Sequence, residues 1–109
     1  GHSGCGGVQG CYDMCSGNAP ELEEKSSFVG RWMDILRPGF DRLPAGDDAA
    51  RKQALEKEAI LVSLTNLMSF PFVKDAVDAE KLSLHGVWNE IGKGELETFD
   101  STSQTFVAI

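Results

Sequence analysis

The sequence lacks several features that mark common classes of protein. No apolar stretch approaches the roughly 20 residues that a bilayer-spanning helix needs. Basic residues are few, with 10 Lys and Arg against 17 Asp and Glu, and the formal net charge is −7. A chain of this charge is poorly suited to bind nucleic acid or an anionic membrane surface. We therefore expect neither a nucleic-acid partner nor a membrane partner.

Cysteine is also scarce. The three cysteines are an odd number, which does not suit a set of paired disulfides. The simplest account is an enzyme that keeps reduced thiols for a metal, and no cleavable signal peptide is visible. We therefore expect a cytoplasmic location. The 109 residues, 41% hydrophobic and 25% charged, suit one globular domain with a modest core.

The most informative segment is the first one, Gly1-His2-Ser3-Gly4-Cys5, followed by Gly6-Gly7. Zinc is bound by neutral imidazole nitrogen and by thiolate sulfur. The spacing of His2 and Cys5 lets a single turn direct both side chains at one point, which forms half of a zinc site. The two glycines free the backbone to turn tightly and to expose N–H groups to an anion.

Helical patterns dominate the first three quarters of the chain. We expect helices over residues 8–16, from the N-cap Ser27 to Pro38-Gly39, over residues 49–70 and over residues 72–79. The third of these is apolar nearly all round from Ala59, so it should be covered on more than one side. Phe28, Trp32 and Ile35 repeat at helical spacing, which favours core or subunit-interface packing over a ligand platform.

The last quarter of the chain predicts β structure. Leu82–His85 alternates apolar and polar residues, and the pattern continues through residues 87–91. Gly92-Lys93-Gly94 predicts a hairpin turn, residues 95–99 the returning strand and residues 105–109 a last extended segment. His85 is the second histidine, and we interpret it as a hydrogen-bonded residue and not as a ligand.

Three blocks of the sequence resemble the beta-class carbonic anhydrases. Residues 1–8 are similar to that family's G-H-S-x-C-G-G signature. Residues 58–67 with 70–73 resemble its S-L-x-N-L helix and P-F-V step, and residues 82–86 with Ile91 and 94–96 resemble its late strand and hairpin. The resemblance implies an α/β fold whose mainly parallel sheet is flanked by helices, here helices followed by a late strand and hairpin.

The resemblance also implies a reaction, the zinc-dependent, reversible hydration of carbon dioxide to bicarbonate and a proton. His2 and Cys5 would be two of three protein ligands to Zn²⁺, and the backbone of Gly6 and Gly7 would contact carbon dioxide or bicarbonate. The family's third ligand belongs to a C-x-D-x-R motif that has no counterpart here, so no catalytic Asp/Arg pair is identifiable. We expect residues 1–109 to be the C-terminal part of a single domain, inactive alone, in a homodimer or higher homo-oligomer.

Other interpretations stay open. Cys11 and Cys15, at i and i+4, are extra ligands beside His2 and Cys5 in a closed structural zinc site, or they are small packing residues, which we favour. The chain is alternatively a carbonic-anhydrase-like assembly module without catalysis. Asn89 stands where some bacterial members have the Tyr of an H-G-W-x-Y pattern, so the bicarbonate-regulated site of those members is in doubt.

Overall fold

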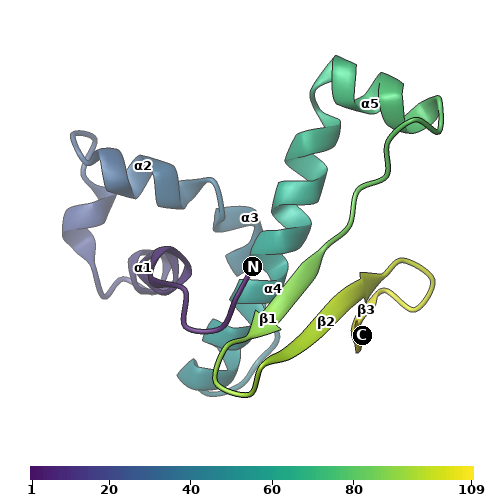
Figure 1. Ribbon diagram of the computed structural model, residues 1–109. Coiled ribbons are helices and arrows are strands. Elements are labelled where there is room, and N and C mark those ends of the chain that lie inside the picture. Colours follow the sequence, from purple (N-terminus) through teal and green to yellow (C-terminus); the bar gives the residue numbers. More distant parts are fainter.

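The computed structural model describes residues 1–109, and α4 is its central element (Figure 1). In chain order the elements are α1 (Gly6–Cys15), the 3-10 turn η1 (Pro20–Glu23), α2 (Phe28–Asp34), α3 (Arg37–Asp41), α4 (Asp48–Met68), α5 (Pro71–Asp78), β1 (Val87–Glu90), β2 (Glu95–Asp100) and β3 (Thr105–Ala108). Helices α1 and α3 and strand β1 all pack against α4. The expected order of helices followed by strands is confirmed.

Local sequence sets the limits of α4. Asp47 has an extended backbone, and its carboxylate accepts a hydrogen bond from the Ala50 N–H at 2.8 Å, which caps the first turn. The helix ends at Met68, and Pro71 occupies the first turn of α5, where a missing N–H does no harm. The predicted helix over residues 49–70 is therefore confirmed to within two residues at its C-terminus.

The expectation that Pro38-Gly39 ends the second helix is wrong. Ser27 does cap that helix, because its hydroxyl accepts from the Gly30 N–H at 2.9 Å, but α2 already ends at Asp34. Pro38 lies instead in the first turn of the short helix α3. Proline is tolerated in the first turn of a helix as well as after its end, so its presence alone does not say which side of a break it occupies.

The core is small and lies where α1 crosses α4. Its members are Val8, Cys11, Tyr12, Leu55 and Ala59. Only 14 of the 109 residues are buried, and the radius of gyration is 15.1 Å, above the roughly 13 Å expected for a closed domain of about 100 residues. The chain therefore has an open shape.

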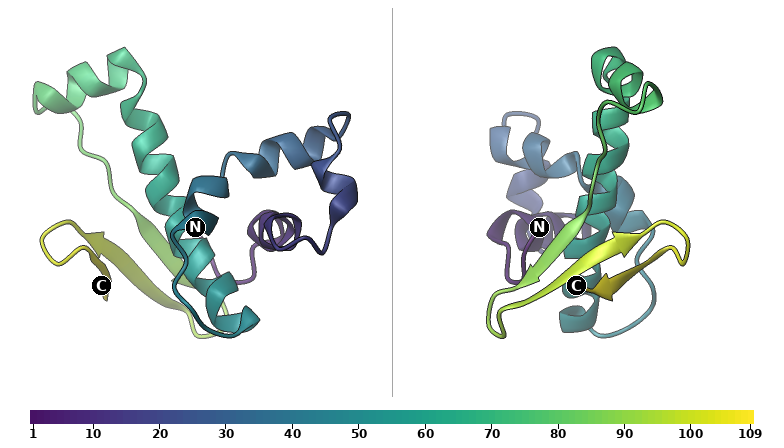
Figure 2. Two further views of the ribbon diagram at one scale, coloured as in Figure 1. Left: turned by 180° about the vertical axis from the view of Figure 1, so that it is seen from behind. Right: turned by 45° about the vertical axis from the view of Figure 1, so that its right-hand side comes forward.

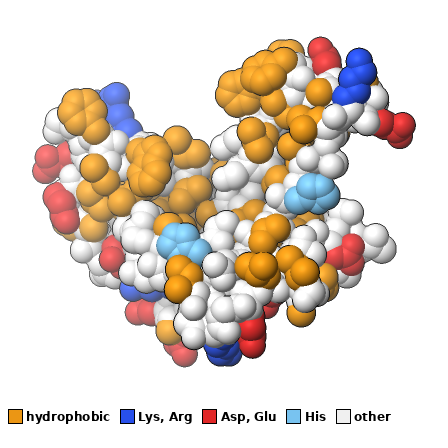
Figure 3. Space-filling model, in the orientation of Figure 1, with side chains coloured by type: hydrophobic (Ala, Val, Ile, Leu, Met, Phe, Trp, Pro, Cys, Tyr) orange, Lys and Arg blue, Asp and Glu red, His pale blue; other side chains and the backbone are white.

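Two arms diverge from this core, and both views in Figure 2 show them apart. One arm is α2, and the other is the C-terminal part of α4 with α5. Hydrophobic side chains gather along both arms and in the hollow between them (Figure 3). Trp32 on α2 is 64% exposed and Phe72 on α5 is 73% exposed. The Phe28, Trp32 and Ile35 stripe is thus not core within this chain, and its role at an interface stays a prediction.

The strands form one antiparallel sheet in the order β1-β2-β3. Val87 pairs with Thr98 and Glu97 with Ala108, and the turn before β2 includes Gly94 at φ +67, as the predicted hairpin requires. The expected strand over Leu82–His85 is wrong, because pairing begins only with Gly86, whose carbonyl oxygen accepts from the Phe99 N–H at 2.8 Å. The segment instead runs as an extended connection from α5 to β1 (Figure 1).

None of the helices taken singly has the length and apolar character to cross a membrane. Helices α4 and α5 pass such a test only as a pair, and they are bent by 91° relative to each other.

Candidate active site

The segment with His2 and Cys5 is held beside β1 by backbone pairing. The Asn89 N–H donates to the Gly1 carbonyl oxygen at 3.0 Å, and the Ser3 N–H donates to the Asn89 carbonyl oxygen at 2.8 Å. These bonds form a parallel bridge between His2 and Asn89, next to an otherwise antiparallel sheet. The Ile91 N–H also donates to the Ser3 hydroxyl at 2.9 Å. The segment is therefore a short parallel edge of the sheet.

The chain turns away from this edge at Gly4. Its φ of +66 lies in the left-handed region, which glycine adopts without strain. Cys5 follows at the N-cap position of α1, and its carbonyl oxygen accepts from the Gln9 N–H at 2.9 Å. The glycine between the two candidate ligands thus lets the chain pass directly from sheet edge to helix.

His2 and Cys5 line the same pocket, which has a volume of about 400 Å³. The facing part of α4 contributes mainly apolar side chains to the lining, Ala59, Ile60, Leu64 and Leu67. His85 also lines it, and its Nε2 lies 3.0 Å from the Ser83 hydroxyl, in agreement with a hydrogen-bonded residue, although the side chain is exposed. The structure therefore brings the two predicted ligands to one cavity with an apolar wall.

The contacts of His2 suit a metal ligand. Its Nδ1 lies 2.9 Å from the Ser3 carbonyl oxygen, which only accepts hydrogen bonds, so Nδ1 must carry the proton. In the neutral imidazole Nε2 is then the unprotonated nitrogen, and it is free to bind a metal. With the free thiol of Cys5 on the same pocket, the donors are those that zinc prefers. The residues present therefore fit two positions of a zinc site.

Gly6 and Gly7, the predicted contacts for carbon dioxide or bicarbonate, form the first turn of α1. Neither residue is part of the pocket lining. A Cβ atom on Gly7 would lie 3.1 Å from the ring of Trp32, so the ring would have to shift by a few tenths of an ångström to accept it. A Cβ atom on Gly6 would meet nothing within 4 Å. Their role as substrate contacts stays a prediction.

Cys11 and Cys15 form a separate pair inside α1. Cys11 is fully buried in the core, and its sulfur lies 3.9 Å from that of Cys15. Burial, reinforced by Cys15, raises the pKa of the Cys11 thiol to about 12, and burial also raises the pKa of Cys15. Both thiols are therefore protonated near neutral pH. No group of three or more His, Cys, Asp and Glu side chains is arranged to hold a metal ion.

Sequence reasoning missed Glu56, the buried charged residue beside the turn. Its side chain lies on α4, lines the pocket and is 6% exposed. One carboxylate oxygen accepts from the Gly4 N–H at 2.8 Å and the other from Trp88 Nε1 at 3.1 Å. The available signal was its place in the stripe of Leu55, Ala59 and Val62, where a solvated charge does not belong.

Comparison with known proteins assigns the chain to a family. A sequence profile described as carbonic anhydrase matches residues 1–96. The chain belongs to the beta-carbonic anhydrase family. The family is generally zinc-dependent, in agreement with the donor atoms of His2 and Cys5.

The relatives of this beta-carbonic anhydrase chain are longer than it is. It is 34% identical to beta carbonic anhydrase 3 of Arabidopsis thaliana over 96% of this chain and 41% of that protein. It is 27% identical to carbonic anhydrase 1 of Escherichia coli O157:H7 over 100% of this chain and 48% of that protein. The chain therefore spans about half the length of the curated relatives that it matches.

A solved structure supports the fold assignment. The structure of the beta-carbonic anhydrase CcaA superposes with a TM-score of 0.75 at 29% identity, over 100% of this chain and 52% of that one. The expected beta-carbonic-anhydrase fold, with helices followed by a late strand and hairpin, is therefore confirmed. The three strands of these residues are antiparallel, so the mainly parallel sheet stays a prediction for the whole domain.

Proposed function

We propose that the protein containing this chain is a zinc-dependent carbonic anhydrase that interconverts carbon dioxide and bicarbonate. The observation that carries the proposal is the common pocket of His2 and Cys5 in a chain of this family. His2 would bind zinc through Nε2 and Cys5 through its sulfur. A third protein ligand from outside these 109 residues would complete the set that a catalytic zinc site uses.

The residues of the pocket have different roles in the proposed reaction. When bound, zinc supplies the Lewis acidity that makes hydroxide available from water near neutral pH. The apolar wall of α4, with Ile60 and Leu64, offers a surface suited to a small apolar gas and poorly suited to bicarbonate. The hydrogen bond of His2 Nδ1 to the Ser3 carbonyl fixes the imidazole orientation. The first-turn N–H groups of Gly6 and Gly7 are our candidates for contacts with bicarbonate oxygens.

The wider setting is part of the same proposal. We place the protein in the cytoplasm as a homodimer or higher homo-oligomer, without nucleic-acid or membrane partners. The exposed apolar side chains of both arms support association, because monomeric proteins rarely leave large apolar patches uncovered. Residues 1–109 would then be one part of a single domain.

Cysteine substitutions test the proposal with a matched control. In the full-length protein, Cys5→Ala and His2→Ala should each abolish stoichiometric zinc binding and carbon dioxide hydration. Elemental analysis measures the zinc, and stopped flow measures the hydration. Cys15→Ala removes the same thiol at the other end of α1, about 2.8 helical turns from Cys5, and should retain both. A folded Cys11→Ala variant should retain both as well.

Two results would redirect the proposal. Equal loss of zinc from all four substitutions would favour the closed structural site. A folded wild-type protein that binds no zinc and hydrates no carbon dioxide would favour the assembly module, the alternative suggested by the absence of a three-ligand group within this chain.

A further inference from the structure

The buried carboxylate of Glu56 has no cationic partner in the chain. The six ion pairs of the structure involve other residues. What faces its two oxygens instead is a pair of neutral donors, the Gly4 N–H at 2.8 Å and the Trp88 indole N–H at 3.1 Å. A buried charge is costly unless hydrogen bonds compensate it, so these two bonds are the reason that Glu56 is tolerated there.

The two donors belong to segments that meet at the candidate metal site. Gly4 is the turn residue between His2 and Cys5, and Trp88 is the buried residue of β1, 3% exposed. Glu56 itself comes from α4 and lines the pocket with both candidate ligands. One carboxylate thus connects the ligand turn, the central helix and the sheet.

We infer that Glu56 is a positioning residue that fixes the turn between His2 and Cys5 by accepting hydrogen bonds from Gly4 and Trp88 at once. The inference rests on the proposed function for its consequence, because a fixed turn matters most if both side chains must reach one zinc ion. Only a carboxylate suits this place: glutamine of the same shape has one accepting oxygen and one donating NH₂ group. In Glu56→Gln, one of the two donors would therefore face another donor.

This reasoning predicts a specific rescue. If the glutamine oxygen keeps the Gly4 N–H, its NH₂ group must face the Trp88 indole N–H. Trp88→Phe removes that indole donor, so the double variant Glu56→Gln/Trp88→Phe should hold the turn better than Glu56→Gln alone. A purely space-filling role for either residue would give no such rescue, since the double variant would only add a second defect.

The test uses the naturally encoded protein and two measurements. Hydrogen exchange of the Gly4 amide, followed by NMR on metal-free protein, reports the turn without any zinc. Competition with a chelator reports zinc affinity. Glu56→Gln should speed Gly4 exchange and weaken zinc binding by roughly 10- to 100-fold, the usual effect of losing a supporting partner. Glu58→Gln, on the same helix and paired with Arg42, is the matched control and should change neither.

The outcomes separate the two proposals. Gly4 exchange and zinc affinity in Glu56→Gln equal to those of Glu58→Gln would overturn the positioning role. The positioning role would also be overturned if Glu56→Gln/Trp88→Phe showed Gly4 exchange and zinc affinity no better than those of Glu56→Gln. This comparison of the two variants also decides the case if Glu56→Gln folds poorly. A folded wild-type protein that binds no zinc would instead overturn the proposed function, and Gly4 exchange would still decide whether Glu56 fixes the turn.

Discussion

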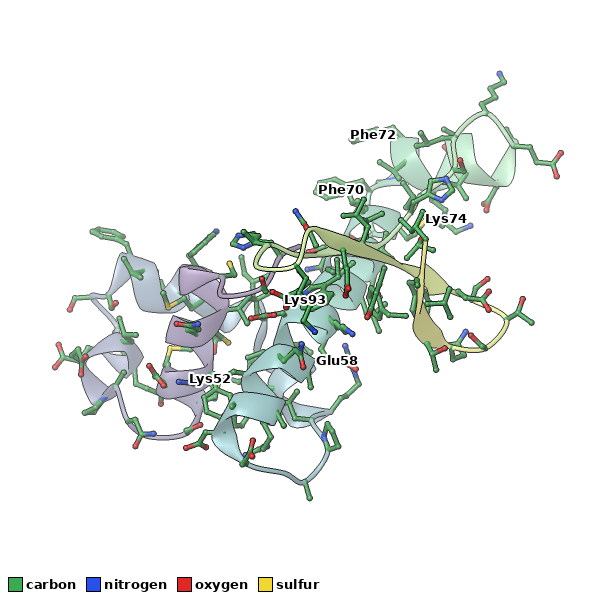
Figure 4. All side chains as sticks on the ribbon, turned by 60° about the horizontal axis from the view of Figure 1, so that its bottom comes forward. Lys52, Glu58, Phe70, Phe72, Lys74 and Lys93 are labelled. Atoms are coloured by element: carbon green, nitrogen blue, oxygen red, sulfur yellow. The ribbon has the colours of Figure 1, made fainter.

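The two halves of α4 carry similar apolar side chains in different surroundings. Leu55 in the first half is 0% exposed under α1, whereas Leu67 in the second half is 42% exposed. Phe70 and Phe72 continue that exposed surface around the bend into α5, away from Lys52 and Glu58 of the first half (Figure 4). Hydrophobic character alone therefore does not decide burial here. The helix contributes buried residues as far as Val62, and from Leu64 onward it presents a partly exposed surface.

The largest expected effect compares the same substitution in the two halves. Leu55→Ala should lower the free energy of unfolding by about 2–5 kcal/mol, because it empties a fully buried site. Leu67→Ala should cost less than about 1 kcal/mol, because its side chain is partly in water. Urea unfolding of both variants measures the difference. Equal losses of unfolding free energy in the two variants would mean that another surface covers Leu67 in the full-length protein.

A pH titration tests how well the core excludes water. Burial raises the pKa of Cys11 to about 12 from its ordinary value of 9.0, so the folded state favours the neutral thiol. Stability from this group is complete below pH 9 and is lost as the pH rises toward 12, by at most about 1.4 kcal/mol for each pH unit. In Cys11→Ala this loss should be smaller. The hydrogen bond to Asp48 raises the pKa of Tyr12 too, so some pH dependence should remain. An unchanged slope in the variant would show that Cys11 is solvated.

Helix caps give a smaller contrast between core and arm. Asp47→Ala removes the cap of α4 and should cost about 1 kcal/mol in global unfolding. Ser27→Ala removes the matching cap of α2, whose only buried residue is Gly30, so its effect on global unfolding should be smaller. Thermal unfolding of the two variants ranks them. The reverse order would show that α2 is part of the cooperative core.

The smallest effect is expected on α5. Lys74 and Asp78 form an exposed ion pair at i and i+4, and Asp78 raises the pKa of Lys74. Exposed pairs of this kind add little to stability, so Lys74→Ala should leave the midpoint of thermal unfolding unchanged within error. A clear drop would indicate that this face of α5 is covered by another surface.

Local signals made much of this fold predictable. The apolar period over residues 49–70 predicted the position of α4, and Gly92-Lys93-Gly94 predicted the hairpin. His2 and Cys5 were placed on one turn from their spacing, and the structure puts both on one pocket. Each of these features depends on residues close together in the sequence.

The features that sequence reasoning missed depend on distant residues. Glu56 accepts hydrogen bonds from Gly4, 52 residues away, and from Trp88, 32 residues away. No local pattern reveals contacts of this range. The alternation in Leu82–His85 is typical of a strand, but a strand also needs a neighbour to pair with, and none lies beside that segment. Contact of Gly6 and Gly7 with a substrate stays a prediction, because neither residue lines the pocket.

The pairing of the first three residues with β1 has a consequence for folding order. Gly1 donates to the Val87 carbonyl across 86 positions, and Ile91 donates to Ser3 across 88. Contacts of such long range close a large loop and form late, after local helices and hairpins. During synthesis on the ribosome, residues 87–91 emerge long after residues 1–3. We therefore expect the turn with His2 and Cys5 to gain its support from the sheet only after residues 87–91 have been synthesised.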